Sequence, residues 1–200
     1  TLDLNGQKGV LGNVVISGTG QAGYATGAFG ALWNSSYAAA SLSGGLTLSG
    51  SATVGGYGDL SLGLVNSASG VTLTKTGGAV LTMNGDNASL LGGITVSVGT
   101  LRMGHANALG DAVGITTISN GAVLDLNGFS TNENITVTGA GYGGSGLVSG
   151  YGPVSSLGAI INSGSAAVTL GGTVTMGGTT AFGTSYVNAA SGLAQSGGDI

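Results

Sequence analysis

Few residues in this sequence could take part in chemistry, and they are scattered along the chain. The 200 residues include seven Asp and Glu, three Lys and Arg, one His and no Cys. His105 stands in the turn-like stretch GHANALG, with Asp111 six residues away and no nucleophile motif beside it. A catalytic triad or a metal site needs several partners close together. We therefore expect His105 to be an exposed turn residue, and we predict no catalytic residue and no enzyme activity.

Glycine-rich stretches approach two kinds of ligand-binding loop without meeting their chemical requirements. GGYGDLSLG at 55–63 resembles the calcium-binding nonapeptide, but its Asp comes one position early and the motif does not recur. Calcium takes roughly six to eight oxygen ligands, and the acids here form no cluster. GTGQAG at 18–23 and the set Gly139, Gly141 and Gly144 fit G-x-G-x-x-G, yet no acid follows about 20 residues on, as a dinucleotide site requires. We predict no metal and no cofactor.

Two other features could serve a polysaccharide. Glycoside cleavage needs two acids that face each other across a groove, and neighbouring turns of a coil could supply them. The aromatic residues concentrate in one segment, at Tyr24, Phe29, Trp33 and Tyr37. Trp33 and Tyr37 are therefore candidate carbohydrate contacts. Trp33 aligns with Ile161 of a related stretch, which favours core packing of its side chain, and both interpretations stay open here.

The charge content excludes several classes of partner. Only 5% of the residues are charged, against about 25% in ordinary globular proteins. With Lys8, Lys75 and Arg102 as its only basic residues, the chain cannot neutralise a run of phosphates or an anionic membrane surface. Polar residues interrupt every apolar run well short of the roughly 20 residues of a membrane span. We predict no nucleic-acid partner and no membrane insertion of this segment.

The composition is nevertheless that of a chain with a core. Gly accounts for 44 of the 200 residues without a G-X-Y period, which excludes collagen, and 42% of the residues are hydrophobic, which excludes a flexible linker. The sequence starts at Thr1 without Met. We interpret it as a piece of a longer chain or as a processed product.

Alternating apolar and small polar residues predict many short β-strands. Runs of about five residues, such as LDLN, LTLS and ITVT, have a period of two and end at Gly, Asn or Ser. No stretch combines a helical period with capping residues. Short strands, small corner residues and scarce charges favour a β-solenoid over a two-sheet sandwich, so we predict an all-β fold.

The same alternation predicts which side chains face the core. In VLDLNG at 123–128, Leu124 and Leu126 should point inward and Asp125 toward solvent. Asp3, in the related TLDLNG at 1–6, should also be solvated. Asn-Gly pairs, which suit turns with positive φ, occur in both stretches and again at 84–85 and 120–121.

Four blocks recur in the same order, which predicts an internal repeat with a period of about 122. The pairs are TLDLNG (1–6) with VLDLNG (123–128), NVVISGTG (13–20) with NITVTGAG (134–141), GALWNSS (30–36) with GAIINSG (158–164), and LTLSGSATVGG (46–56) with VTLGGTVTMGG (168–178). Each pair is separated by nearly the same offset, and only the third pair departs from it noticeably. We therefore divide a single solenoid segment, 1–200, into a first repeat, 1–122, and a partial second repeat, 123–200.

The stretch LTKTGGAVLTMNGDNASLLGGITVSVGTL at 73–101 resembles the autotransporter-associated β-strand repeat, also called the passenger-associated transport repeat. The matching residues are Leu73, Thr74, Lys75, Gly77, Leu81, Gly85, Asn87, Gly92, Gly93, Thr95, Val96, Gly99 and Leu101. The family's continuation matches Gly104, Ala108, Leu109, Gly110 and 121–128, so the resemblance extends from 71 to 128. In two departures, the second opening Gly is displaced to Gly78, and Ser89-Leu90-Leu91 with one extra residue replaces the family's aromatic residue.

The resemblance implies a right-handed parallel β-helix in a passenger of a Gram-negative autotransporter or in a very large bacterial surface protein. It implies export to the cell surface or beyond, and assistance of that export by 73–101. At roughly 20–25 residues per turn, 200 residues would make roughly eight to ten turns.

Two functional hypotheses follow. The first is a structural or adhesive segment of a large cell-surface or extracellular protein, a rigid rod or fibre that meets a host-cell or glycan surface. The alternative is the β-helical scaffold of a polysaccharide-binding or polysaccharide-degrading protein. The scarcity of Asp, Glu, Arg, Lys and His favours the first. Because the ends carry little charge beyond Asp3 and Asp199, we also expect end-to-end self-association or continuation in a longer chain.

Overall fold

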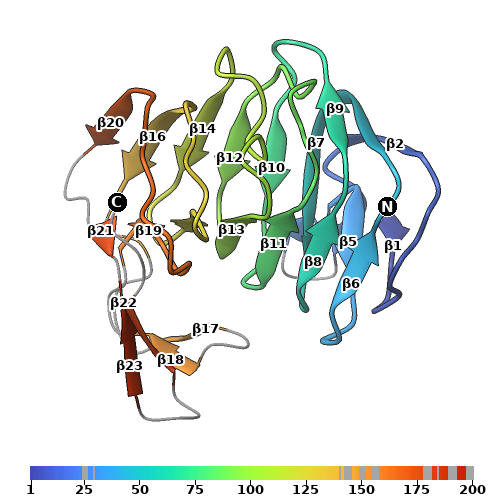
Figure 1. Cartoon of the computed structure of the whole chain (residues 1–200). Helices are drawn as coiled ribbons and strands as arrows, with labels where there is room; N and C mark the ends of the chain where they lie inside the picture. The colour runs from blue at the N-terminus through green and yellow to red at the C-terminus, as the bar shows by residue number, and fades with distance from the viewer. Residues whose placement is uncertain are drawn as a thin grey trace.

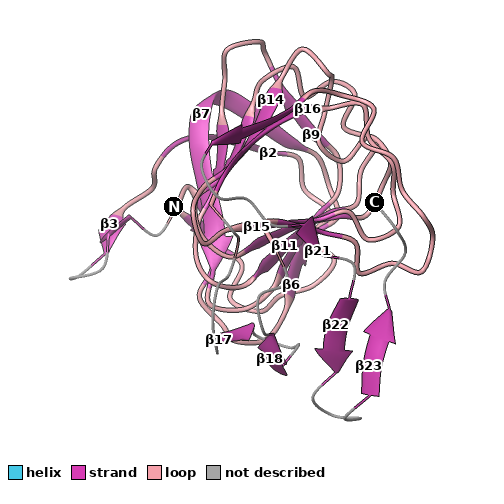
Figure 2. Ribbon diagram, turned by 90° about the vertical axis from the view of Figure 1, so that its left-hand side faces the viewer, coloured by secondary structure: helices cyan, strands magenta, loops and turns pink. Residues whose placement is uncertain are grey.

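Short parallel strands wind into a β-solenoid, which confirms the all-β prediction (Figure 1). The computed structural model describes residues 1–23, 27–28, 30–139, 141, 146–148, 152–154, 158–177, 182–183, 185–188 and 193–196, with side chains for 1–21, 30–139, 141 and 158–177. This part of the chain contains no helix. Figure 2, turned by 90°, shows successive turns lying behind one another around a common interior.

The larger sheet has ten strands, eight of which form one column. In order they are β1 (Leu2–Asp3), β5 (Leu32–Asn34), β7 (Leu46–Gly56), β10 (Leu73–Lys75), β12 (Ile94–Val96), β14 (Ile115–Ile118), β16 (Asn134–Thr138) and β20 (Val174–Gly177). The long strand β7 reaches a further side of the coil, where its first residues pair with β2 (Val14–Gly18) and β9 (Val65–Ser67). All of these pairs are parallel, as stacked turns require.

The second sheet stacks seven strands on another side of the coil. They are β6 (Ala40–Leu42), β8 (Leu60–Leu62), β11 (Val80–Met83), β13 (Thr100–Met103), β15 (Val123–Asp125), β19 (Ile160–Ile161) and β21 (Phe182–Gly183). Isolated parallel bridges, Ser67 with Leu90 and Thr131 with Leu170, continue the remaining side. In the strands of these two sheets the backbone groups therefore pair with the turns before and after.

The coil has about five regular turns, so the predicted eight to ten were too many. Successive register partners along the larger sheet are Leu32, Val54, Lys75, Val96, Ile118 and Val137, and their positions in the sequence advance by nearly equal steps. The flanking steps, from Leu2 to Leu32 and from Val137 to Met176, are clearly longer. The prediction failed because it spread the whole chain over turns of uniform length.

Small antiparallel pairs account for part of the chain that does not join the coil. Two lie within the long steps: β3 (Ala22–Gly23) with β4 (Gly27–Ala28), and β17 (Gly146–Val148) with β18 (Gly152–Val154). A third joins β22 (Ser185–Asn188) to β23 (Leu193–Ser196) near the end of the chain. Antiparallel strands need only a short connection, so such hairpins can be inserted between two turns without breaking the stack.

Like residues stack on like residues inside the coil. Along the second sheet the register partners Leu60, Leu81, Leu101, Leu124 and Ile160 are all 2% exposed or less. Leu126 is fully buried as well, so the inward prediction for both LDLN leucines is confirmed. Burying each such side chain contributes about 1.5–3 kcal/mol, and this repeated burial holds the turns together.

Corner glycines let neighbouring turns approach closely. Gly77 and Gly99 both have a φ of 77°, a region that disfavours side chains. A Cβ on Gly77 would clash with the carbonyl oxygen of Gly56 in the turn before, and a Cβ on Gly99 with that of Gly77. These positions therefore require glycine for both conformation and space.

Candidate functional site

The residues that match the transport repeat extend from β10 to β13, over parts of two successive turns of the coil. Their apolar members are buried: Leu73, Leu81, Val96 and Leu101 are all 1% exposed or less. Thr74 and Thr95 are register partners on the partly exposed face, and the motif glycines lie outside the strands. In these two turns the motif residues build the core and the corners, and they gather no set of reactive groups.

Lys75 is the unusual member, because its amine lies inside the coil. Its side chain is 1% exposed and occupies the column between Val54 and Val96. The Nζ atom donates to the carbonyl oxygens of Thr76 (3.1 Å), Val98 (2.9 Å) and Gly77. Burial lowers the pKa of Lys75 to about 7, although the negative charge of Asp59 opposes this shift.

Asn87 ties three turns together from a fully buried position. Its Oδ1 accepts from the backbone N–H of Val65 at 2.8 Å, and its Nδ2 donates to the carbonyl of Ala108 at 2.9 Å. Its own N–H donates to the carbonyl of Asn107. This buried amide replaces backbone pairing where a corner interrupts the ladder.

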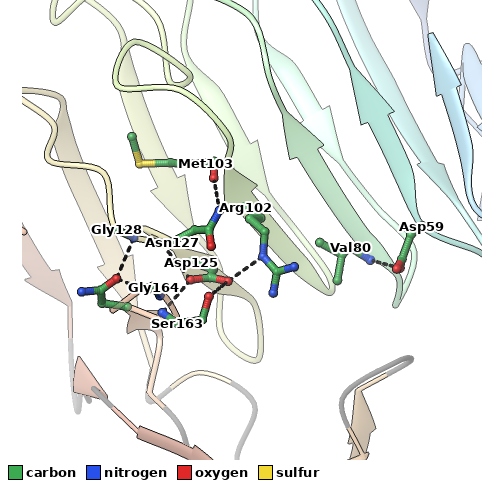
Figure 3. A network of polar contacts seen from close by, with 10 residues as sticks. Asp59, Val80, Arg102, Met103, Asp125, Asn127, Gly128, Ser163 and Gly164 are labelled. Atoms are coloured by element: carbon green, nitrogen blue, oxygen red, sulfur yellow. Dashed lines mark hydrogen bonds and ion pairs between the residues drawn. The ribbon is translucent and has the colours of Figure 1, made fainter. Parts of the chain in front are cut away.

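Asp125 lies at the centre of a polar network, so the prediction that it faces solvent was wrong (Figure 3). Its carboxylate is fully buried. It accepts from Arg102 Nε (2.7 Å) in the turn before and from Ser163 Oγ (2.7 Å) in the turn after. The N–H groups of Asn127 and Ser163 donate to its Oδ1. The alternation of side chains along the strand correctly predicted that Asp125 points away from the apolar core. It is nevertheless buried, because Arg102 and Ser163 in the turns on both sides cover it.

The related Asp3 makes a similar set of backbone contacts at the first copy of the same sequence. Its Oδ1 accepts from the N–H groups of Asn5 (2.9 Å) and Ser35 (3.0 Å). We call residues 3–6 with 33–38 the Asp3 corner, and residues 125–128 with 161–166 the Asp125 corner. In each corner a buried amide continues the pattern, Asn34 toward the N–H of Gly6 and Asn162 toward that of Gly128.

Exposed aromatic rings line the Asp3 corner. Tyr37 is 86% exposed and stacks on Tyr57 of the next turn, with ring centroids 5.9 Å apart. Trp33 is 7% exposed and meets Tyr57 edge-on at 5.6 Å. Trp33 is thus buried, but it lies outside the apolar core cluster that contains Leu32, on the face of β5 that it shares with Asp3 and Gly55, so the core packing that its alignment with Ile161 favoured is not found. Tyr37 lies on the surface. Tyr24 and Phe29 lie outside the described residues.

A small cavity adjoins these rings. It has a volume of about 210 Å³ and is lined by Thr1, Asp3, Gln21, Trp33, Ser35 and Tyr57. Sequence analysis did not single out Tyr57, although the pairing of Trp33 with Gly55 brings the two segments side by side. The sequence feature that could have identified Tyr57 is its position in the corner after β7, which lies one turn after the corner that contains Tyr37.

A larger cavity of about 340 Å³ lies on another part of the coil. It is lined by Ala88, Ala106, Asn107, Gly110, Asp111, Ala112, Ser130, Thr131, Asn132 and Glu133. Glu133 is 3% exposed; its Oε1 accepts from Thr116 Oγ1 at 3.3 Å, and its Oε2 has no hydrogen-bond partner. Burial raises the pKa of Glu133 to about 7, and the nearby charge of Asp111 adds to this effect. Nothing in the local sequence pointed to this residue, because only the coil brings 106–112 beside 130–133.

The remaining sequence candidates have structural contacts. His105 lies in a turn, where its Nδ1 accepts from the N–H of Asn107, and it is half-buried where we expected exposure. Asp59 of GGYGDLSLG accepts from the N–H of Val80. Gly18, Gly20, Gly139 and Gly141 have positive φ, whereas Gly144 and Asp199 lie outside the described residues. In the described ranges no three His, Cys, Asp or Glu side chains gather as they would around a metal ion.

The part of the chain that the structure describes holds no apolar helix of membrane-spanning length.

Comparison with known proteins gives a partial similarity. No family model and no solved structure matches the chain. A region of 77 residues, 38% of this chain, is 38% identical to the adhesin BmaC autotransporter of Brucella suis biovar 1 (strain 1330). The match spans only 2% of that much longer protein. The similarity and the β-solenoid together fit a structural or adhesive segment at a bacterial surface.

Proposed function

We propose that this chain is a rigid β-solenoid segment of a large bacterial cell-surface or extracellular protein, with a structural or adhesive role. The observation that carries the proposal is the unbroken parallel register through about five regular turns. Five steps of roughly 4.8 Å make a stiff rod of about 24 Å, which further turns would lengthen without changing its cross-section. The partial similarity to an autotransporter adhesin supports the surface location.

Buried polar contacts between turns favour a load-bearing role. Asn87, Lys75 and Asp125 each bond to groups in a neighbouring turn. Such contacts resist sliding of one turn over the next, because a shifted register would leave buried polar atoms unpaired. The segment 73–101 would assist export through the early stacking of its two successive turns, which Lys75 joins by donating to the carbonyl oxygen of Val98.

The location is tested on intact cells that produce the full-length parent protein with an epitope tag in the exposed turn at Val113. Antibody labelling and proteolysis by external protease before lysis would support the proposal. Labelling that appears only after lysis would contradict it. A tagged cytoplasmic protein in the same cells controls for leakage.

Polysaccharide binding is the second candidate function, and the stacked Tyr37–Tyr57 pair favours it. Exposed aromatic faces beside hydroxyl and carboxylate groups suit the apolar face and the hydroxyls of a sugar ring. A glycan array should then show binding that Tyr37→Ala and Tyr57→Ala abolish. We propose binding without cleavage, so a turnover screen on acidic and neutral polysaccharides should release no product.

A further inference from the structure

The outer face of the larger sheet carries a regular column of threonines. Figure 1 shows β10, β12, β14 and β16 side by side along the coil, and they pair in register with β7 before them and β20 after them. At one position of these strands the register partners are all threonine: Thr53, Thr74, Thr95, Thr117, Thr136 and Thr175. Each of these threonines is at least partly exposed, so the column lies on the surface.

A second hydroxyl column runs beside the first. In β10, β12, β14, β16 and the residues that directly follow them, the sequence reads TKT, TVS, TIS and TVT, which places hydroxyls at Thr76, Ser97, Ser119 and Thr138. The N–H of Ser97 donates to the carbonyl of Lys75 and that of Ser119 to the carbonyl of Val96, so the parallel ladder continues to this column. Neighbouring strands are roughly 4.8 Å apart and two residues along a strand span about 6.6 Å, so the hydroxyls form a two-dimensional lattice.

The hydroxyl groups of both columns are available to an external partner. Within the part of the chain that the structure describes, none of them makes a hydrogen bond to another protein group. Other surface hydroxyls of the same sheet differ in this respect, since Ser51 Oγ accepts from the N–H of Thr72. The array therefore presents donors and acceptors that the fold itself does not use.

The face is also uncharged. Lys75 is the one charged residue within β10, β12, β14 and β16, and its side chain points into the coil with 1% exposed. Ile115 and Asn134, which border the first column, are neutral as well. A rigid, neutral lattice of hydroxyls has no attraction for ions or charged polymers. It complements a neutral surface that has its own regular array of hydrogen-bonding groups.

We propose that this face binds the surface of ice. A single hydroxyl gains little from ice, because liquid water offers it equivalent hydrogen bonds. Many hydroxyls held at fixed positions bind together without further loss of conformational freedom, so their weak contacts add up. Oxygen atoms on ice surfaces repeat at distances similar to both spacings of the array, and the continuous backbone ladder keeps the array in register.

The make-up of the array favours ice over a crystalline polysaccharide, the other neutral surface with regular hydroxyls. The faces of sugar rings pack against aromatic side chains, and β10, β12, β14 and β16 contain none. The proposal goes beyond the rod function and does not depend on it, because the isolated chain can be tested in solution.

The test grows ice slowly in a dilute solution of the chain and measures the fraction of protein taken into the ice, from which ordinary solutes are excluded. We expect the unchanged chain to be enriched in the ice. Thr95→Lys and Ser119→Lys each place a charge and a longer side chain within the array, and each should lower the enrichment at least about fivefold, because the contacts act together. Thr47→Lys is the matched control and should be enriched like the unchanged chain, since Thr47 lies on the side of the coil where β2 and β9 pair.

Three results would overturn the proposal: exclusion of the unchanged chain from ice, equal enrichment of all three variants, or retention on crystalline cellulose or chitin without enrichment in ice. The circular dichroism spectra of the variants must match that of the unchanged chain. Thr95→Lys and Ser119→Lys alter different columns at partly exposed positions, so a variant that keeps its fold decides the outcome if the other does not.

Discussion

The Asp3 corner and the Asp125 corner have the same local sequence and different surroundings. In both, an Asn-Gly pair with positive φ follows the strand: Asn5 has a φ of 44° and Asn127 of 49°. Yet Asp3 is exposed, whereas Asp125 is fully buried. The comparison teaches that LDLNG specifies the turn, and that the neighbouring turns decide whether its acid meets solvent.

The partners of the two acids explain the difference. Among the strands that the structure describes, β1 lies at one end of its sheet and pairs with β5 alone, whereas β15 lies between β13 and β19. Only Asp125 therefore receives donors from two sides, Arg102 and Ser163. At Asp3 partial burial would raise the pKa, but the hydrogen bonds from Ser35 and Asn5 outweigh this and lower it.

The largest expected difference between the corners comes from their leucines. Leu124→Asp places an unpaired carboxylate at a fully buried site and should cost about 4 kcal/mol or more of unfolding free energy. Leu2→Asp, at a site that is 39% exposed, should cost about 1 kcal/mol. Urea unfolding monitored by circular dichroism measures both. Equal losses would mean that the two corners do not differ in burial.

The acids themselves give the next largest effect. Asp125→Ala leaves Arg102 and the donors of Ser163 without their acceptor, and should lower the unfolding free energy by about 2–4 kcal/mol. Asp3→Ala removes only partly exposed contacts and should cost about 1 kcal/mol or less. The same urea series checks both variants. If Asp125→Ala left the unfolding free energy unchanged, this would support the prediction from the sequence that Asp125 is solvated.

Two further buried groups, Lys75 and Glu133, should make the stability of the folded chain depend on pH. The folded pKa of Lys75 falls from 10.5 to about 7, so the unfolded chain binds more protons in that range and stability should rise with pH above 7. The pKa of Glu133 rises from 4.5 to about 7, so the folded chain binds more protons there and stability should fall as pH rises toward 7.

The melting temperature should therefore pass through a minimum near pH 7. Lys75→Met should flatten the alkaline side only, and Glu133→Gln the acidic side only. Calorimetry from pH 4 to pH 10 would reveal this, using Asp3→Asn as a control. A curve that only rises or only falls would show that one of the two groups is not buried in solution as described, and a flat curve would show this for both.

The smallest effect concerns the strand edges. The outer edge of β1 has no partner within the described chain, whereas β15 is paired on both sides. We expect the isolated chain to self-associate weakly through such edges, and Leu2→Lys to reduce this. Light scattering across a concentration series measures the effect. A monodisperse monomer at high concentration would contradict self-association and would support a spacer role within one long chain.

Much of the fold can be predicted from the local alternation of residues in the sequence, but the buried polar sites cannot. Alternation identified the buried leucines and the all-β class, because strand side chains alternate whatever the tertiary context. The turn count and the burial of Asp125 depend on insertions and on neighbouring turns, which local pattern does not contain. The division into repeats at 122 stays a prediction.

Strand pairing also shows where repeated alternation can mislead a local comparison. Val14 pairs with Leu46 at the start of β7, on the side of the coil where β2 and β9 pair. Ile135, which the sequence blocks place opposite Val14, lies instead in the column that contains Ala52 and Val174. Stretches that alternate in the same way can therefore occupy different sides of the coil.

The central claim is the parallel, in-register stacking of turns, and engineered disulfides test it most directly because the chain has no Cys. Thr74 pairs with Thr95 and Thr95 with Thr117, so three partly exposed threonines lie on successive strands. Adjacent strands are roughly 4.8 Å apart, within disulfide range, and alternate strands are about twice that. Under mild oxidation, Thr74→Cys with Thr95→Cys should form an intramolecular disulfide rapidly, and Thr74→Cys with Thr117→Cys should not. Absence of the first disulfide, or equal formation of both, would contradict the solenoid.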